Sequence, residues 1–200
     1  MQGSKGVVRL AHMTVSVQGP PAAPSAAFDV QAFRMTLGRF ATGVAVVTAK
    51  AADGALIGLT MSSFNSVSLD PPLVLFSIGR SAYSLSAMLE ARSFGINLLS
   101  RAQRDLSDRF AKAQTDKWRD VAHVVSDLEA PLLDSALAHF ECRPYAHYDG
   151  GDHVIFVVEV LRFSVPSEGE GPLVFFGGRY HSLQDQNQAT PAWPLPLHYF

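Results

Sequence analysis

The chain has 200 residues, of which 48% are hydrophobic and 17% charged, a balance that predicts a globular protein and excludes a disordered one. Sixteen Lys and Arg residues against eighteen Asp and Glu residues leave a net charge of −2, which excludes the basic surface expected of a nucleic-acid-binding protein. Apolar runs fall short of the ~18 residues of a membrane-spanning helix, and the start of the chain lacks the apolar segment of a secretory signal. Cys142, the single cysteine, has no intrachain disulfide partner. We therefore expect a cytoplasmic protein that contacts neither nucleic acid nor membrane.

The two ends of the chain differ in composition from the middle. Residues 1–27 hold scattered glycines, prolines and small residues without sustained periodicity, which predicts a flexible N-terminal arm. Residues 184–200 combine polar residues with prolines and aromatic side chains, which predicts an extended C-terminal tail. This tail is apolar enough to pack on the body or on a second subunit, and a loose terminus fits it equally well. Residues 28–183 have the usual size of one domain.

The first predicted elements of this domain are a helix and a hairpin. Apolar residues recur at helical spacing over 28–42, and Gly43 ends the pattern, so a helix is predicted there. Two β-rich runs follow at 44–48 and 55–60. The Asp53-Gly54 pair between them is a strong signal for a hairpin turn.

The middle of the domain mixes strands with short helices. The apolar run 73–78 predicts a buried strand, and the apolar stripe of 81–92 predicts a helix after it. A further strand is predicted over 94–98. Ser100 and Gln103 then have the spacing of a capping box, which predicts a helix at that point.

The last third of the domain contains only strand patterns. Small or apolar residues alternate with polar ones over 136–143, which predicts a strand with one wet face. The run 153–163 is almost wholly apolar and predicts a central strand buried on both faces, and 172–176 is the last strand candidate. Helices do not alternate with strands as a parallel sheet requires. The predicted fold class is therefore mainly β, a small closed antiparallel barrel with peripheral helices.

Several familiar motifs are missing from the sequence. The patterns G-x-G-x-x-G, G-x-x-x-x-G-K-[ST], H-E-x-x-H and G-x-S-x-G do not occur, so the usual signatures of a Rossmann site, a P-loop, a zinc protease and an α/β-hydrolase are absent. The histidines do not form the i, i+4 pair of a helical metal site, although His139, His147 and His153 can converge across strands. We predict no bound metal.

A polar segment from Thr60 to Ser68 is the most informative feature. It holds five hydroxyls and one amide in nine residues, at the exit of a predicted strand. These neutral groups suit a polar ring edge, a ribityl chain or a phosphate. A serine-rich surface loop has a similar composition, but the apolar residues within the segment favour an ordered one. Downstream, Arg80 and Ser81 meet at the start of a predicted helix, which suits an anion, although Ser81 alone is also a plain helix cap.

Two turns carry further candidate residues. Gly151-Asp152-His153 precedes the long strand, and its histidine is either a polar turn residue or a ligand contact. The segment 176–181 places Arg179, Tyr180 and His181 after a Gly-Gly turn. These side chains can bind an anion or stack on a planar ring, and the alternative is a terminal turn with exposed polar residues.

Five motifs occur in a consistent order along the domain. They are F-R-x-x-L-G-x-F-A-T-G-V (33–44), G-L-T-M-S-S-F-N-S-V-S-L-D-P-P-L-V (58–74), F-G-I-N-L-L-S (94–100), G-D-H (151–153) and P-L-V-F-F-G-G-R-Y-H (172–181). Together they resemble the short-chain flavin reductases, the reductase components of two-component flavin-dependent monooxygenases. The resemblance covers residues 28–183, and the serine-rich motif is its most specific part.

The resemblance implies a homodimeric, FMN-binding split barrel with the flavin in a groove near the subunit interface. It implies that the isoalloxazine and ribityl groups contact Thr60, Met61, Ser62, Ser63, Ser66, Ser68, Phe94, Gly95 and Asn97. It implies that Ser77, Arg80 and Ser81 face the phosphate. His153 is expected against the nicotinamide as the catalytic residue, with Arg179 and Tyr180 as companions.

The predicted function is NAD(P)H-dependent reduction of FMN or FAD by hydride transfer, with the reduced flavin diffusing to a partner monooxygenase. In such an enzyme the protein supplies proximity and orientation, and the cofactors supply the chemistry. Two alternatives remain open: a split-barrel flavoenzyme that retains its flavin and reduces another acceptor, and a flavin-binding protein without catalysis. The absence of a basic cluster for a 2'-phosphate favours NADH over NADPH.

Overall fold

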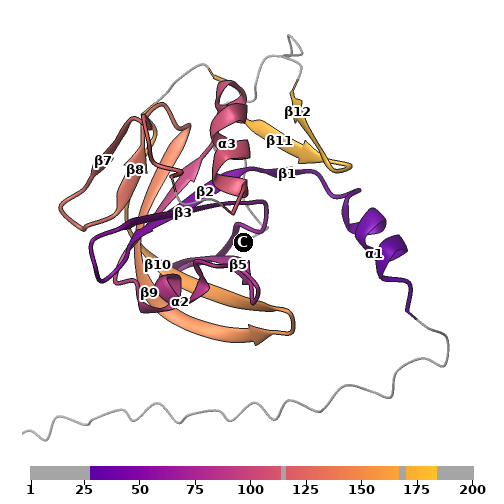
Figure 1. The fold of residues 1–200 in the computed structure, drawn as a ribbon, viewed down its shortest axis with the longest axis horizontal. Helices are drawn as coiled ribbons and strands as arrows, with labels where there is room; N and C mark the ends of the chain where they lie inside the picture. Colours follow the sequence, from indigo (N-terminus) through magenta and orange to yellow (C-terminus); the bar gives the residue numbers. More distant parts are fainter. Residues whose placement is uncertain (1–27, 114–115, 167–169, 184–200) are drawn as a thin grey trace, which may run out of the picture.

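The computed structural model describes residues 28–113, 116–166 and 170–183. The predicted arm and tail, residues 1–27 and 184–200, lie outside the described residues. Strands dominate the described part, and the helices lie around them (Figure 1). The structure is mainly β, as the sequence predicts.

One antiparallel sheet forms the body of the molecule. Its strands lie in the order β3-β2-β6-β9-β10-β5-β4, and every neighbouring pair is antiparallel. These strands are β2 (Ala45–Lys50), β3 (Leu56–Met61), β4 (Asn65–Leu69), β5 (Pro72–Gly79), β6 (Phe94–Leu98), β9 (Ala138–Gly150) and β10 (His153–Ser164). Side chains of β2 and β5 share one core cluster although three strands separate them in the sheet, so the sheet curls into a barrel (Figure 1).

Aromatic side chains fill the interior of this barrel. The ring of Phe76 stacks on that of Phe156 with centroids 5.0 Å apart, and Phe94 meets Phe76 edge-on at 5.6 Å. All three rings are fully buried, and α2 (Leu85–Glu90) adds Met88 to the same core. Because truncation of such a ring costs about 3–5 kcal/mol, this packing fixes β5, β6 and β10 relative to one another.

A second core covers the outer face of β2. Its side chains come from α3 (Arg104–Ala111), β8 (Pro131–Leu133) and β11 (Leu173–Phe176), among others. The 3-10 helix η1 (Arg101–Gln103) leads into α3, and β7 (His123–Val125) pairs with β8. Since successive strand residues face opposite sides, Val46 packs outward against Phe110 and Leu173 while Val47 packs into the barrel. Both faces of β2 are therefore buried. This explains why its sequence is almost wholly apolar.

The predicted capping box is present before α3. The side chain of Gln103 accepts the backbone N–H of Ser100 at 3.0 Å, and the Ser100 side chain accepts the backbone N–H of Gln103. These two bonds pair N–H groups that helix geometry leaves without intrahelical partners. They fix where the helix begins.

A small second sheet has the order β1-β11-β12, with β1 (Thr42–Gly43) and β12 (Arg179–Ser182) at its edges. The predicted Gly-Gly turn joins β11 to β12. Gly177 and Gly178 have φ of 57° and 77°, a left-handed backbone that favours glycine. The residues after this turn are therefore a strand and not a loose terminal turn.

Helix α1 (Val30–Leu37) is shorter than the helix predicted over 28–42. The Asp29 carboxylate caps its start by accepting two backbone N–H groups at 2.9 Å. The helix ends before Gly38 because the chain must extend to pair β1 with β11. α1 buries no residue and stands apart from the barrel (Figure 1).

Two other predictions need correction. The helix predicted over 81–92 begins at Leu85 and has Ser84 as its N-cap, so the cap role of Ser81 is wrong. Hydrogen-bonded turns occupy residues 80–84 instead. Strand β10 is exposed from Leu161 onward, because its pairing with β5 ends at Glu159 and only β9 continues beside it.

Candidate functional site

A hollow of about 350 Å³, here called the serine hollow, lies at the C-terminal end of β3. It is lined by Leu59, Thr60, Met61, Ser62, Ser63, Ser77, Ile78, Gly79, Ala82 and His153. Three strands supply this lining: β3 and the turn after it, the end of β5, and the start of β10. The polar segment and the turn histidine, 90 residues apart in the sequence, therefore meet at one place.

Ser63 anchors the turn after β3. Its hydroxyl accepts the backbone N–H of Ser77 at 3.0 Å and donates to the Ser77 carbonyl at 3.3 Å. These two hydrogen bonds connect the turn after β3 to β5, although β3 and β5 are not paired as neighbouring strands. Ser62, beside it, is exposed at the rim of the hollow.

Thr60 ties the floor of the hollow to α3. Its hydroxyl donates to the Ser107 carbonyl at 2.7 Å. The Ser107 hydroxyl is in turn hydrogen-bonded to the Tyr180 hydroxyl at 2.9 Å, and the Arg104 guanidinium lies over the Tyr180 ring at 5.5 Å. Through these contacts β12 and α3 hold β3 in position, which makes Thr60 a positioning residue.

His153 stands opposite Gly79 in the β10–β5 register. Its Nδ1 is 2.7 Å from the Asp152 carboxylate, and this contact lowers the pKa of that carboxyl. A Cβ on Gly79 would lie 3.7 Å from Nε2, so Nε2 faces the bare backbone of the glycine. The ring is oriented by Asp152 and presents its other nitrogen to the hollow. Gly79 falls inside the segment 77–81 that the resemblance assigns to the phosphate, but the structure places it against His153.

Arg80 fastens the β9–β10 hairpin. Its Nε donates to the Gly151 carbonyl and its Nη2 to the Asp149 carboxylate, both at 2.8 Å. The pairing lowers the pKa of Asp149. This guanidinium therefore holds the turn that precedes His153. Ser81 next to it is exposed.

The remaining predicted contacts do not line the serine hollow. Ser66 and Ser68 lie on β4, where the Ser68 hydroxyl accepts the backbone N–H of Asp70 at 3.2 Å. Arg179 is exposed on β12. Their roles as ligand contacts stay predictions.

The predicted contacts on β6 are buried in the barrel wall. Phe94 belongs to the inner core. The Asn97 amide donates to the Val46 carbonyl at 3.0 Å and accepts the backbone N–H of Leu133 at 2.8 Å. A Cβ on Gly95 would overlap the Pro131 carbonyl oxygen. Each of these residues has a packing or hydrogen-bonding role of its own, and their flavin contacts also stay predictions.

No three His, Cys, Asp or Glu side chains gather as metal ligands do within residues 28–113, 116–166 and 170–183. In the same part of the chain, no helix is both long and apolar enough to cross a membrane.

Comparison with known proteins places the chain in a family. The model of the flavin reductase like domain matches residues 37–184. An FMN reductase (NADH), SmoA of Agrobacterium fabrum, is 45% identical over 156 residues, which cover 78% of this chain and 87% of SmoA. HsaB of Mycobacterium tuberculosis, a flavin-dependent monooxygenase reductase subunit, is 33% identical over 88% of this chain and 94% of its own length.

A solved structure supports the same assignment. The NADH:FAD oxidoreductase SgcE6 of Streptomyces globisporus, solved with NAD and FAD fragments, superposes with a TM-score of 0.73 at 34% identity. The match covers 78% of this chain and 93% of SgcE6. The chain belongs to the flavin reductase family. The predicted fold, an FMN-binding split barrel, and the predicted class, a flavin oxidoreductase, are confirmed.

Proposed function

We propose that this chain reduces free FMN or FAD with NADH and supplies the reduced flavin, by diffusion, to a partner monooxygenase. The observation that carries the proposal is the serine hollow. There a polar turn and an oriented histidine meet beside Gly79, which has no side chain to cover the histidine ring. SmoA, HsaB and SgcE6 support it by the activities in their names.

The lining of the serine hollow suits a flavin. Its volume of about 350 Å³ falls within the range of about 300–1,000 Å³ usual for ligand pockets. Met61 and Ala82 offer apolar surface to a planar ring, and Ser62 and Ser77 bring hydroxyls to the same lining. The names of SmoA and SgcE6 give NADH as the donor, which supports NADH over NADPH.

The residues of this chain contribute positioning. When bound, the flavin accepts at N5 the hydride that nicotinamide C4 donates. Asp152 fixes the His153 ring, and Arg80 fixes the turn that carries it. We place the nicotinamide against His153, which β10 contributes to the serine hollow. Holding two planar rings together in this way accounts for much of the rate that an enzyme adds to a hydride transfer.

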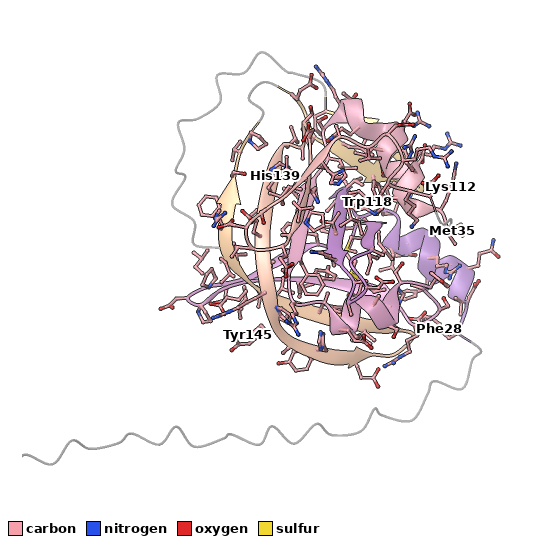
Figure 2. All side chains as sticks on the ribbon, turned by 60° about the vertical axis from the view of Figure 1, so that its left-hand side comes forward. Phe28, Met35, Lys112, Trp118, His139 and Tyr145 are labelled. Carbon is pink, nitrogen blue, oxygen red and sulfur yellow. The ribbon has the colours of Figure 1, made fainter. Side chains whose placement is uncertain are left out.

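A second copy of the chain is the proposed partner of α1. Its apolar side chains are exposed, and Phe28 and Met35 lie at the outer edge of the molecule (Figure 2). The exposed group comprises Phe28, Val30, Phe33, Met35, Leu37 and Phe40. Val30, Phe33 and Leu37 share one face of α1, and an exposed apolar face marks an interaction surface, which supports the homodimer. We expect the parent to sediment at twice the monomer mass and Phe33→Glu to sediment as a monomer. A monomeric parent contradicts the proposed dimer.

We also propose the cytoplasm as the site of action. Cys142 is buried as a free thiol, and burial together with the nearby Glu141 carboxylate raises its pKa to about 12. A thiol this hard to ionise is inert, which suits a protein without disulfides in a reducing compartment.

One spectrophotometric assay tests the proposed activity. NADH oxidation is followed at 340 nm with FMN, FAD or no added flavin. The account expects oxidation in proportion to added flavin. Protein that purifies yellow and ignores added flavin indicates a flavoenzyme with retained flavin, and flavin binding without NADH oxidation indicates a carrier. Either result overturns the proposal.

A further inference from the structure

The side chain of Tyr180, on β12, is tied to helix α3. Its hydroxyl is hydrogen-bonded to the Ser107 hydroxyl at 2.9 Å. Its ring meets the Phe175 ring edge-on at 5.6 Å, and the Arg104 guanidinium lies over it, 5.5 Å from the ring centroid. Three contacts thus hold this side chain in place. Tyr180 is not among the residues that line the serine hollow, so these contacts, and not a place in the lining, indicate its role.

Ser107 connects Tyr180 to β3. It is fully buried, and its carbonyl accepts the hydroxyl of Thr60 at 2.7 Å. The same residue therefore bonds to Tyr180 with its side chain and to Thr60 with its backbone. A strand near the end of the domain is joined in this way to a strand near its beginning, through one residue of α3.

The pleat of β3 turns Thr60 toward α3. Thr60 is paired with Val46 in the β2–β3 ladder, and Val46 belongs to the second core, which α3 helps to form. Gly58 lies two residues earlier on the same face of β3. A Cβ on Gly58 would overlap the Phe110 ring of α3, so the glycine allows the helix to approach. α3 therefore contacts β3 at two points on one face, Gly58 and Thr60.

This support matters at the C-terminal end of β3. Thr60 and Met61 line the serine hollow, and the polar turn of residues 62–63 follows directly. β3 is an edge strand of the barrel sheet, with β2 as its single strand neighbour within the described residues. α3 thus gives β3 the lateral support that the inner strands of the sheet receive from a second neighbour.

We propose that Tyr180 is a positioning residue for the flavin, which fixes the lining end of β3 through Ser107 and Thr60. The proposal rests on the proposed function and assigns Tyr180 to the flavin side of the reaction. The role predicted from the resemblance, a companion of His153 at the nicotinamide, would assign it to the hydride donor. The two roles predict different kinetic effects of one substitution.

The test replaces Tyr180 by phenylalanine, which keeps the ring beside Phe175 and Arg104 and removes only the hydroxyl. Tyr145→Phe is the matched control, because Tyr145 is an exposed residue of β9 (Figure 2). Flavin affinity is measured by fluorescence quenching, and kcat and KM are measured separately for flavin and for NADH. Thermal unfolding followed by circular dichroism shows that each variant is folded at the assay temperature.

Tyr180→Phe is expected to lower the affinity for flavin and kcat/KM for flavin about three- to tenfold, the effect of losing one hydrogen bond between neutral groups. At saturating flavin, kcat/KM for NADH should stay within about twofold of the parent value. Tyr145→Phe should change neither quantity. A fall in kcat/KM for NADH with unchanged flavin affinity indicates the companion role and overturns the proposal, and so does parent-like behaviour of Tyr180→Phe with both substrates.

A double-mutant cycle tests whether Ser107 is the connection. Ser107→Ala removes the hydroxyl that bonds Tyr180 and keeps the carbonyl that accepts Thr60. If the effect passes through Ser107, Ser107→Ala/Tyr180→Phe should bind flavin about as well as the weaker single variant, whereas independent effects multiply. Multiplied losses overturn the proposal. If the parent oxidises no NADH with either flavin, the proposed function fails, while the flavin affinities of these variants still decide the role of Tyr180.

Discussion

The barrel wall at β6 and the rim of the serine hollow both carry polar residues, and the two regions use them differently. Asn97 in the wall is fully buried, and both ends of its amide are paired with backbone groups. At the rim, Ser62 is exposed, and Nε2 of His153 faces Gly79. Similar chemistry thus stabilises the fold in one place and stands open to a ligand in the other. Burial and the presence of protein partners distinguish the two uses.

The largest effect is expected in the wall, from Gly95→Ala. The added Cβ overlaps the Pro131 carbonyl oxygen and the Thr48 hydroxyl, so the strands must move apart. We expect a loss of about 3 kcal/mol in the free energy of unfolding, measured by denaturant titration. Gly43→Ala is the control, because a Cβ there meets nothing within 4 Å. Equal stability of the two variants contradicts this account of β6.

A somewhat smaller loss is expected from Asn97→Ala. The change leaves the Val46 carbonyl and the Leu133 N–H buried without their partner, at a cost of about 2 kcal/mol. Asn65→Ala serves as the control, since Asn65 is exposed on β4. Should Asn97→Ala weaken flavin binding without lowering stability, Asn97 belongs to the site and not to the wall.

At the rim the expected change concerns binding. Ser63→Leu puts a bulky side chain into the serine hollow and removes the bonds to Ser77, so flavin affinity should fall about tenfold. Ser66→Leu is the comparison, because Ser66 lies outside the hollow and its predicted flavin contact is decided by this pair of variants. Fluorescence quenching measures both. A fall in affinity only in Ser66→Leu would move the flavin to β4.

The smallest effect is a dependence on pH at the β9–β10 hairpin. Arg80 holds the pKa of Asp149 below its usual value of 3.8. The ion pair between the two side chains is therefore fully formed above that pH, and it is lost as the pH falls through the lowered pKa. An NMR titration of the Asp149 carboxyl should have its midpoint below 3.8 in the parent and at a higher pH in Arg80→Met, where only the Gly151 N–H still lowers the pKa. Identical midpoints mean that the ion pair does not persist in solution.

Much of the fold could be predicted because it depends on local patterns. Asp53-Gly54 forms the predicted hairpin, and the Ser100–Gln103 capping box forms as expected. The length of α1 and the start of α2 were misjudged, because tertiary pairing of β1 and turns at 80–84 decide them. Apolar periodicity does not encode such pairing.

The site was predictable only in part. The polar turn and His153 stand out as clusters of unusual composition, and both line the serine hollow. Asn97 could not be separated from the rim residues, since burial is not visible in the sequence of one strand.

The most direct test of the central claim compares His153→Ala with the parent in stopped-flow reduction of flavin at several NADH concentrations. If the imidazole contacts the nicotinamide, kcat/KM for NADH should fall roughly ten- to a hundredfold, while flavin affinity stays nearly unchanged. This fall corresponds to a loss of about 1–3 kcal/mol in transition-state stabilisation. This asymmetry follows because two different strands, β10 and β3, bring His153 and the polar turn to the serine hollow. Equal rates in the two proteins, or a parallel loss of flavin binding, would contradict it.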